Sequence, residues 1–248
     1  MDFFRSATIQ TPVSLPARRF AHWMPLLGSR QLDAYHIGEL ELLQDIYHPR
    51  RILPVIGPHH KTVLDVGCGA GQTLIARGIP KDVQAIGVDM DESALALGKR
   101  LAPNIEFILA RGEHLPFKDE SFDLIVCRVA LPYMHVSTAL KEMSRVSRPG
   151  GDIWLTLHRM SWVLRELLAA ASNLDAKLLL KELYVLANGI VFYFSGCEFH
   201  FPFRPNKWES FQTDKGIRRI LSKLGFGGIS IDCSHGSFVV QASRTRRE

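Results

Sequence analysis

Three alternating glycines stand in the stretch KTVLDVGCGAGQTLIARG, residues 61–78, after an apolar run and before a short helical pattern. Glycine permits positive φ angles and lets the backbone approach a ligand closely. A helix that begins at this point would also present unpaired N–H groups and the positive end of its dipole. The stretch therefore predicts either a structural turn or a loop whose backbone N–H groups close on a ligand.

Two acidic residues bear on which ligand would suit this loop. Asp65 stands two residues before Gly67, the first glycine of a GxGxG pattern that continues with Gly69 and Gly71. A carboxylate here would repel a pyrophosphate, which dinucleotide folds bind with a GxGxxG loop, but it would suit an ammonium group. Asp89 ends the next apolar run, where an acid is placed to accept hydrogen bonds from ribose hydroxyls. The glycine loop with Asp65 comes first along the chain and Asp89 comes second, which is the order a ligand site needs. The combination favours a ligand site over a purely structural turn at the glycines and a helix cap at Asp89.

The elements that must position these residues alternate along the chain. Apolar runs typical of buried strands cover 62–66, 83–89, 105–110, 122–130, 150–158, 228–234 and 237–243. Helical patterns cover 31–47, 72–77, 91–102, 137–146 and 214–225. This alternation predicts an α/β fold, Rossmann-like and doubly wound, with a mostly parallel seven-stranded sheet. The short turn HG between the last two strands indicates an antiparallel C-terminal hairpin.

Two segments fall outside this rhythm. Residues 1–60 are rich in proline and predict a helical and irregular leader that packs on the main domain, 61–248, or partly covers a site. Residues 159–213 form an apolar helical insertion after the fifth strand, which begins where ligands bind in such sheets. Six of its aromatic residues indicate a lid over an apolar or planar substrate, a second small core, or a homodimer interface through 159–203. They are Phe192, Tyr193, Phe194, Phe199, Phe201 and Phe203.

Composition narrows the function classes. The chain has 248 residues and a formal net charge of +5, part of it in the C-terminal RTRRE, so a nucleic-acid partner is not expected. The four cysteines form no CxxC pair, which favours a reducing compartment. No signal peptide is expected in 1–15. The uncharged run 183–197 is shorter than the roughly 20 residues of a spanning helix, so we expect a cytoplasmic protein without a transmembrane segment.

Four motifs resemble those of class I S-adenosylmethionine-dependent methyltransferases. They are VLDVGCGAG, GVDMDESAL, LPFKDESFDLIVC and LKEMSRVSRPGG, at 63–71, 87–95, 115–127 and 140–151. The resemblance covers about 60–158 and, more weakly, the last 35 residues. It is strongest for the type with methyltransferase domain 11, whose members often methylate small molecules. It implies S-adenosyl-L-methionine as cofactor and methyl transfer to a small molecule by in-line displacement.

The resemblance also implies which residues hold the cofactor. Asp65 and the glycine loop, with Gly67, Cys68, Gly69 and Gly71, would hold the methionine portion. Asp89 would bind the ribose, and Met90 would pack against the adenine.

The segment before LPF departs from the family pattern. It often carries an Asp that meets the adenine amino group, and here Arg111 stands at that position. The backbone of Gly112 and Glu113, or the Glu113 side chain, could replace that contact. Arg128 follows the fourth strand near the expected methyl group, and we expect it to turn outward or to meet an acidic substrate, because a guanidinium repels a sulfonium.

A catalytic base is needed only if the nucleophile arrives protonated, since positioning supplies much of the acceleration. The candidates near the expected site are His114, Tyr133 and His135. Each has a structural alternative: His114 as a loop residue, Tyr133 as a pocket wall and His135 as a helix cap. His59 and His60 are adjacent, but no third ligand stands at metal spacing, so no metal site is expected.

Other functions remain open from the residues alone. An RNA or protein methyltransferase would share the cofactor motifs, but no RNA-binding appendage is visible. A non-catalytic partner that binds S-adenosylmethionine usually loses the glycine loop or the ribose acid, and this chain keeps both. An NAD-dependent dehydrogenase has a similar topology, and the GxGxG loop with Asp65 argues against it.

Overall fold

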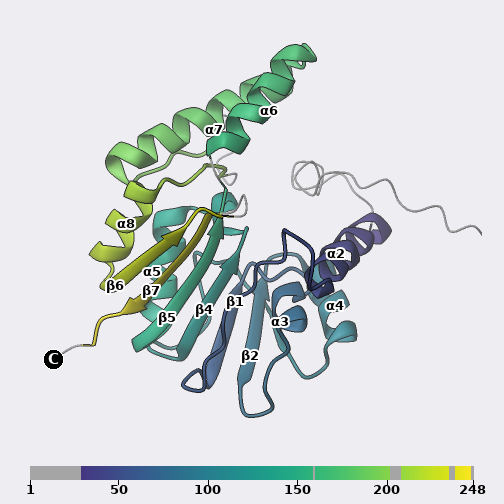
Figure 1. Ribbon diagram of the computed structural model, residues 1–248, viewed down its shortest axis with the longest axis vertical. Helices are drawn as coiled ribbons and strands as arrows, with labels where there is room; N and C mark the ends of the chain where they lie inside the picture. The colour runs from purple at the N-terminus through teal and green to yellow at the C-terminus, as the bar shows by residue number, and fades with distance from the viewer. Residues whose placement is uncertain (1–28, 159, 202–207, 235–237, 247–248) are drawn as a thin grey trace, which may run out of the picture.

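A computed structural model describes residues 29–158, 160–201, 208–234 and 238–246. Its centre is a seven-stranded sheet with the strand order β3-β2-β1-β4-β5-β7-β6 (Figure 1). Strands β1 to β5 run parallel, and β7 runs antiparallel to both β5 and β6. The strands are β1 (Thr62–Val66), β2 (Gln84–Asp89), β3 (Glu106–Leu109), β4 (Phe122–Arg128), β5 (Ser147–Leu157), β6 (Phe226–Asp232) and β7 (Phe238–Arg244). The predicted fold class, including the antiparallel C-terminal hairpin, is confirmed.

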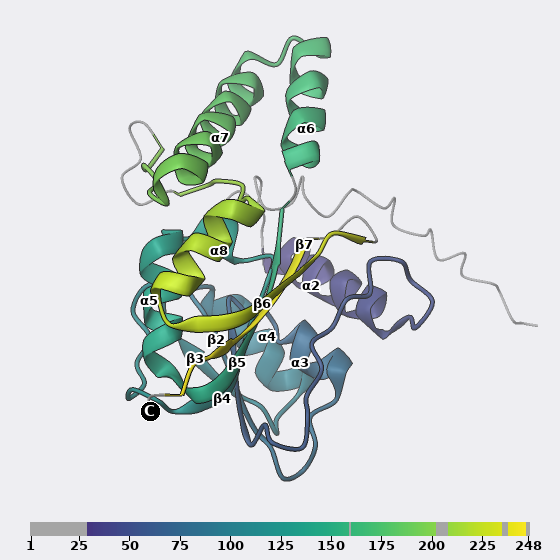
Figure 2. The ribbon, with the colours of Figure 1, turned by 60° about the vertical axis from the view of Figure 1, so that its left-hand side comes forward.

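Helices cover both faces of the sheet (Figure 2). One face carries α3 and α4, and the other carries α5 and α8. The helices are α2 (Ser29–Gln44), α3 (Gln72–Arg77), α4 (Glu92–Leu101), α5 (Val136–Val146), α6 (Met160–Ser172), α7 (Ala176–Ser195) and α8 (Asp214–Lys223), with a short 3-10 helix, η2 (Leu131–Tyr133). Two covered faces explain why the inner strands read as continuous apolar runs.

Burial alternates between the two faces along each strand. In β1, Val63 packs in the cluster under α3 and α4, whereas Leu64 packs in the cluster under α5 and α8. Both side chains are fully buried. Asp65 follows in register with Val63 and therefore lies on the α3–α4 side, at the carboxyl end of the strand.

The turn after β1 requires glycine. Gly67 has a φ of +72°, and a Cβ built there would lie 2.2 Å from the Cβ of Ala130, which follows β4. Any side chain at this position would force the two strand ends apart. The close approach brings the glycine loop against the segment where β4 ends.

In the described part of the predicted leader, one helix contacts the main domain. This helix spans Ser29–Gln44 and lies against α3 and α4, beside the glycine loop (Figures 1 and 2). An exposed ion pair between Asp33 and Arg100 of α4 helps to fasten it. The helix predicted over 31–47 thus extends three residues beyond Gln44, the last residue of α2. Residues 1–28 lie outside the described part of the chain.

The insertion folds into a helical hairpin, α6 and α7, which extends away from the sheet (Figures 1 and 2). Val163, Tyr184, Val185 and Phe211 form a small core inside it, and Phe201 packs against this core, whereas Phe192 belongs to the main core. Among the predicted aromatic residues, Phe192 is fully buried and Phe194 is exposed, and Phe203 lies outside the described residues.

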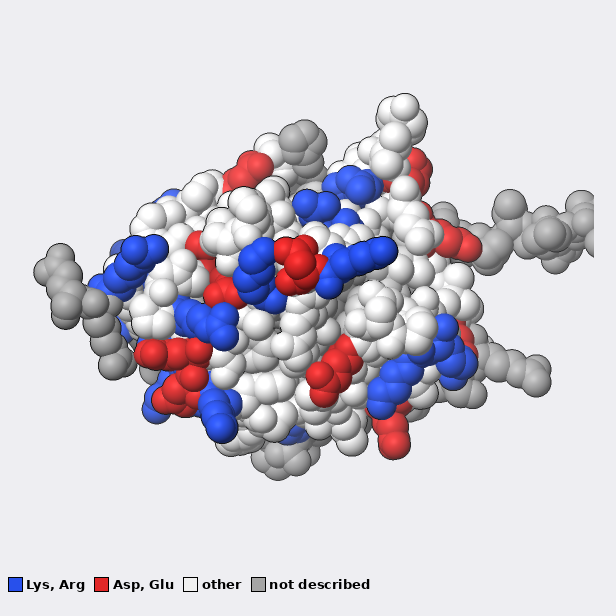
Figure 3. Space-filling view, turned by 90° about the horizontal axis from the view of Figure 1, so that it is seen from below, with Lys and Arg blue, Asp and Glu red and all other residues white. Residues whose placement is uncertain are grey.

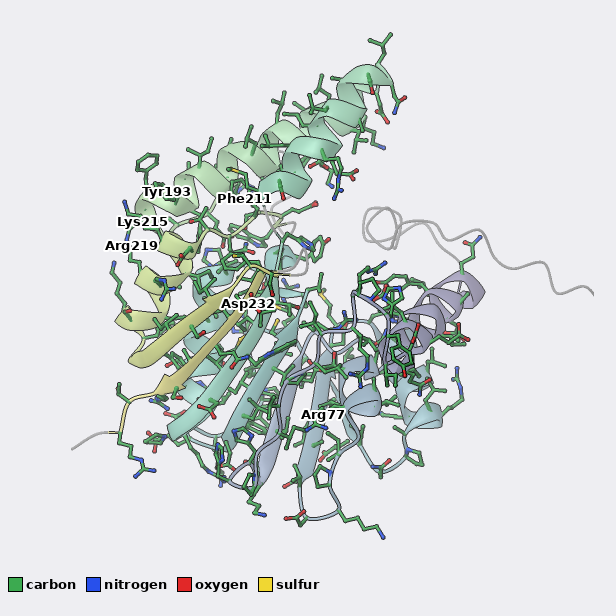
Figure 4. The ribbon with its side chains drawn as sticks, in the orientation of Figure 1. Arg77, Tyr193, Phe211, Lys215, Arg219 and Asp232 are labelled. Carbon is green, nitrogen blue, oxygen red and sulfur yellow. The ribbon has the colours of Figure 1, made fainter. Side chains whose placement is uncertain are left out.

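The C-terminal end of α7 is held by two cations of α8 (Figure 4). Arg219 donates from Nη1 to the carbonyl oxygens of Tyr193 and Phe194, at 3.1 and 2.7 Å. Lys215 places Nζ 4.8 Å from the centre of the Tyr193 ring. Positive charge at the carboxyl end of a helix is favourable, because the last carbonyl groups carry the negative end of the dipole.

By length and composition alone, α7 could cross a membrane. This is weak evidence, since the core helix of a soluble protein passes the same test. The helix also carries a buried ionic cluster, in which Lys181 lies 3.0 Å from Glu182 and 2.8 Å from Glu209. A charged cluster of this kind is typical of a helix packed on protein.

Candidate functional site

The candidate site lies at the carboxyl ends of the parallel strands. In an open α/β sheet, ligands bind outside these ends. Asp65, Asp89 and Arg128 lie at the ends of β1, β2 and β4, and His158 follows β5. The glycine loop and α2 border the same edge.

Four backbone N–H groups of the glycine loop, those of Gly67, Cys68, Gly69 and Gly71, already have partners. Gly67 and Cys68 both donate to the carbonyl oxygen of Val88, at 2.8 and 3.0 Å. Gly71 donates to the carbonyl oxygen of Cys68 at 2.9 Å. The loop is therefore tied to β2 and to itself, and its role in holding the methionine portion of the cofactor stays a prediction.

The Cys68 side chain points away from the ligand edge. Its thiol is buried in the apolar cluster under α3 and α4 and lies 3.4 Å from the carbonyl oxygen of Gly69. Burial raises the pKa of the Cys68 thiol, with smaller contributions from the charges of Asp65 and Asp89. A thiol kept protonated in this way is inert.

Asp65 is a buried carboxylate without a partner among the described residues. The residue is 1% exposed, and neither carboxylate oxygen accepts a hydrogen bond from a described residue. Burial raises the pKa of Asp65 to about 7, the Asp89 charge also raises it, and the Arg128 charge lowers it. Buried polar groups are rarely left unpaired. The unpaired state of the Asp65 carboxylate therefore indicates most directly that this site binds a cationic group.

Asp89 links the glycine loop to the end of β2. Its Oδ2 accepts from the Gly69 N–H at 2.8 Å, and its Oδ1 accepts from the Asp91 N–H at 2.9 Å. Burial raises the pKa of Asp89, although these two hydrogen bonds lower it. Asp91, which accepts from the N–H groups of Ser93 and Ala94, is the N-cap of α4. Asp89 is therefore not the cap of that helix.

Two exposed apolar side chains lie at the ends of neighbouring strands. Met90 follows β2 and is 64% exposed, and Leu109 ends β3 and is 58% exposed. Leu109 is paired in register with Asp89, and Met90 follows Asp89 directly. The side chains of Met90 and Leu109 therefore lie beside the expected ribose position. An exposed apolar pair is suited to cover a planar base.

The segment from Arg111 to Glu113 turns toward α5. Glu113 is buried, and its Oε1 accepts from the His135 N–H at 3.1 Å, while Arg111 lies 3.6 Å from Oε2. A Cβ at Gly112 would meet Met134 Sδ at 2.6 Å. The structure thus engages the Glu113 side chain at the start of a helix, where negative charge is favourable.

Arg128 is turned into the protein rather than outward. Its Nε donates to Thr73 Oγ1 at 3.2 Å, and its Nη2 lies 3.1 Å from Glu39 Oε2 on α2. Glu39 also pairs with Arg50 at 2.8 Å. Glu39 partly neutralises the guanidinium, which reduces the repulsion that we expected toward a sulfonium.

The backbone is strained directly after Arg128. Val129 has a φ of +63°, a conformation that is a genuine outlier for a β-branched residue. Its N–H donates to the Thr156 carbonyl oxygen at 3.0 Å, which holds the strained residue in place. Strain of this kind clusters at active sites, and here it lies where the chain passes the expected methyl group.

Tyr133 and His158 form a pair at the ends of β4 and β5. The Tyr133 hydroxyl lies 3.2 Å from His158 Nε2, and the ring centres are 5.7 Å apart in an edge-on arrangement. His158 is buried, and Tyr133 is half-buried. The structure therefore gives Tyr133 a titratable neighbour.

The other two candidate bases lie apart from this pair. His135 occupies the N-cap position of α5, with its ring 4.4 Å from that of Trp208, and burial lowers its pKa. His114 is exposed, and its N–H donates to the Arg111 carbonyl oxygen. Their proposed catalytic roles stay predictions, and the geometry favours Tyr133.

A third side chain of a type that binds metals, Asp152, lies beside His59 and His60. The spacing along the sequence had indicated no third ligand. The fold brings in Asp152, whose Oδ2 lies 3.3 and 2.9 Å from the two Nε2 atoms. However, His60 Nδ1 accepts from the Gly57 N–H at 3.0 Å, which leaves the proton on Nε2, where it is donated to Asp152. A protonated nitrogen cannot ligate a metal, so this group is a hydrogen-bond network.

Comparison with known proteins agrees with this geometry. Residues 63–151 match the family model described as methyltransferase domain. The demethylmenaquinone methyltransferase of Chlorobaculum tepidum is 26% identical over 68% of this chain and 67% of its own length. Residues 63–151 of this chain are therefore a methyltransferase domain of the S-adenosylmethionine-dependent type.

Further relatives and solved structures extend the comparison. A ubiquinone/menaquinone biosynthesis C-methyltransferase of Bartonella tribocorum is 38% identical over 37% of this chain and 39% of its own length. A Methanosarcina mazei S-adenosylmethionine-dependent methyltransferase has a TM-score of 0.52 at 20% identity, over 77% of this chain and 95% of that one. The YcgJ protein of Bacillus subtilis has a TM-score of 0.51 at 17% identity, over 85% and 99%. At these identities the two structures support the fold.

The protein is thus an enzyme that uses S-adenosyl-L-methionine. The donor set fits this cofactor, because the unpartnered Asp65 carboxylate suits its ammonium group and Asp89 suits its ribose. Sequence reasoning missed three contacts at this edge: those of His36 with Gln72, of Glu39 with Arg128 and of His158 with Tyr133. Only His158 had a sequence feature that pointed to it, namely its place directly after the fifth predicted strand.

Proposed function

We propose that this methyltransferase transfers the methyl group to a small, apolar or aromatic molecule by in-line displacement. The observation that carries the proposal is the Tyr133–His158 pair at the carboxyl ends of β4 and β5, beneath an apolar helical insertion. The names of relatives also support it, since two of them are called quinone methyltransferases.

In this proposal Asp65 holds the cofactor ammonium and Asp89 holds the ribose, with carbonyl groups of the glycine loop as further acceptors for the ammonium. Met90 and Leu109 cover the adenine. The cofactor supplies a methyl group activated by the sulfonium charge. The remaining residues then have to align the acceptor with that methyl group and exclude water.

A proton must leave an acceptor such as a phenol or a hydroquinone ring. Transfer would form the bond from the acceptor to the methyl carbon as the carbon–sulfur bond breaks, with the sulfur becoming a neutral thioether and the acceptor proton left for the protein to take up. Tyr133 and His158 are within hydrogen-bond distance of each other, so the released proton can pass to this pair. We therefore propose Tyr133 as the catalytic residue that touches the acceptor.

A transfer assay with radiolabelled cofactor tests the proposal. The acceptors would be a short-chain demethylmenaquinol, a simple phenol, a small amine, transfer RNA and a mixed protein substrate. Labelling of the quinol or the phenol supports the proposal. Labelling of RNA or protein alone would replace it with the alternative macromolecular function.

Substitution separates catalysis from binding in the same assay. Tyr133→Phe removes the hydroxyl and is expected to lower the transfer rate at least tenfold, a modest share of what general acid–base catalysis contributes. The affinity for S-adenosylhomocysteine, measured by calorimetry, should not change. A non-catalytic binding partner would bind the cofactor and label no acceptor in any arm.

Partners and location follow as further proposals. Lys and Arg are interspersed with Asp and Glu on the face opposite the α6–α7 hairpin (Figure 3), which does not favour a nucleic-acid surface there. The free cysteines Cys68, Cys127, Cys197 and Cys233 support a reducing compartment, and we propose the cytoplasm. The homodimer through 159–203 stays a prediction.

A further inference from the structure

The helix α2 brings one buried side chain to the glycine loop. His36 is 4% exposed, and a Cβ built at Gly69 would lie 3.0 Å from its Cε1. The same Gly69 donates its N–H to Asp89. His36 therefore lies beside the loop and the acid that are expected to hold the ribose.

The hydrogen bonding of His36 leaves one donor unused. Its Nδ1 lies 2.7 Å from Gln72 Nε2, an amide nitrogen that can only donate. Nδ1 is therefore the acceptor, and the neutral ring carries its proton on Nε2. That Nε2 is buried and has no partner among the described residues.

The surroundings of His36 indicate which ligand group would complete it. Gly69, which lies against the His36 ring, donates its N–H to Asp89 Oδ2 at 2.8 Å. The ring thus lies beside the residue that the ribose acid holds. A hydroxyl group can donate to a carboxylate and accept from an N–H at the same time.

We infer that His36 donates its Nε2–H to the ribose hydroxyl of S-adenosylmethionine whose proton Asp89 accepts. The hydroxyl then bridges α2 and β2, and the leader helix becomes part of the cofactor site. Gln72 acts through His36 and positions the ring. The inference rests on the cofactor of the family and is independent of the acceptor.

Calorimetry with two ligands tests it. S-adenosylhomocysteine carries both ribose and amino-acid tail, whereas 5′-methylthioadenosine carries the ribose without the tail. His36→Leu is expected to weaken both ligands by the same factor, about three- to tenfold, because one neutral hydrogen bond is lost in each complex. His36→Gln, which can place a donor near the Nε2 position, should recover most of the affinity.

Matched variants keep the test decisive. His36→Asn places its amide near Nδ1 and cannot reach the ribose, so it should behave as the leucine variant does, and it replaces that variant if leucine prevents folding. Glu41→Ala changes an exposed residue of the same helix and should leave both affinities unchanged. Melting temperatures without ligand establish that each variant is folded.

Two results would overturn the inference. Unchanged affinity of the folded leucine or asparagine variant for both ligands would mean that His36 makes no contact with the cofactor. Loss for S-adenosylhomocysteine alone would place His36 at the amino-acid tail instead of the ribose.

Discussion

In the proposed site, Asp65 and Asp89 divide the binding of one ligand between two neighbouring strand ends. Asp65 is unpartnered, whereas Asp89 already holds the glycine loop through Gly69. A buried carboxylate without a partner is costly in the protein alone and becomes favourable only with a cation beside it. At the scale of residues, the site is therefore arranged for binding at the expense of stability.

Asp65→Asn is expected to stabilise the ligand-free protein and to abolish cofactor binding. Because the pKa of Asp65 is raised to about 7, the folded protein keeps a proton that the unfolded chain loses from about pH 4 upward. The free energy of unfolding then falls as the pH rises toward 7, and above pH 7 the cost is on the order of 2–4 kcal/mol. Urea unfolding at pH 5 and pH 8 measures it, and the Asn variant should lose most of this pH dependence. A variant less stable than the unaltered protein at pH 8 would contradict the argument.

The affinity for S-adenosylhomocysteine should also depend on pH. Binding needs the ionised form of Asp65, so affinity is expected to fall as the pH drops below about 7, approaching tenfold per pH unit. Calorimetry between pH 5.5 and 7.5 measures this slope. A flat profile would mean that Asp65 does not meet the ammonium group.

Asp89→Ala is expected to weaken cofactor binding by about 1–3 kcal/mol, the cost of leaving buried hydrogen-bonding groups unpaired. The same change frees the Gly69 N–H, so the loop should also become more mobile. Hydrogen exchange of the loop amides without ligand reports this second effect. Unchanged affinity would show that Asp89 serves only to hold the loop.

At the scale of elements, the sequence predicted most of the sheet correctly. β1 and α3 coincide with the predicted 62–66 and 72–77, because apolar runs and glycines set their limits. β5 begins three residues earlier than predicted, at Ser147, because Ser147 pairs with Phe122 of β4 and the turn-like RPGG that follows lies at a register shift inside the strand. Local pattern does not show such pairing.

The site was predictable only where its residues share one motif. Asp65, the glycine loop and Asp89 follow one another along the chain. His36, Glu39 and Asp152 come from distant segments, and only the folded chain shows that they meet other residues of the site or of the His59–His60 group. For the same reason, spacing alone could not reveal that the loop N–H groups are already bonded.

The insertion depends on one buried amide. Asn188 Nδ2 lies within 3.1 Å of the Tyr184 hydroxyl and of the Phe199 and Glu209 carbonyl oxygens, and its Oδ1 accepts from the Phe199 N–H. Asn188→Ala leaves these groups unpaired and should cost about 2–4 kcal/mol of insertion stability. Limited proteolysis should cleave the insertion faster, while the affinity for S-adenosylhomocysteine stays the same. Loss of both would mean that the insertion and the cofactor domain unfold together.

At the scale of the whole molecule, α7 presents an apolar stripe outward. Its exposed members recur every three or four residues, at Leu180, Leu183, Ala187, Ile190 and Phe194. Such a stripe is unusual on a monomer surface. It agrees with the predicted homodimer interface and also with a lid over the acceptor.

Leu183→Glu tests the homodimer. If the stripe is the interface, the unaltered protein should elute as a dimer with light-scattering detection, and the variant should be a monomer, because an unpaired charge would be buried at the contact. Ser172→Glu, on the exposed end of α6, is the control. A monomer at micromolar concentration for the unaltered protein would contradict the prediction.

The bonds from Gly67 and Cys68 to Val88, and from Gly69 to Asp89, exist before any ligand arrives. The glycine loop therefore has little conformational entropy to lose when a ligand binds. The entropic cost of binding at this loop is small. A glycine loop held in this way cannot change its shape to fit a different nucleoside. Relatives that prefer a different methyl donor should therefore differ in α2, where a few substitutions leave the folding of the sheet intact.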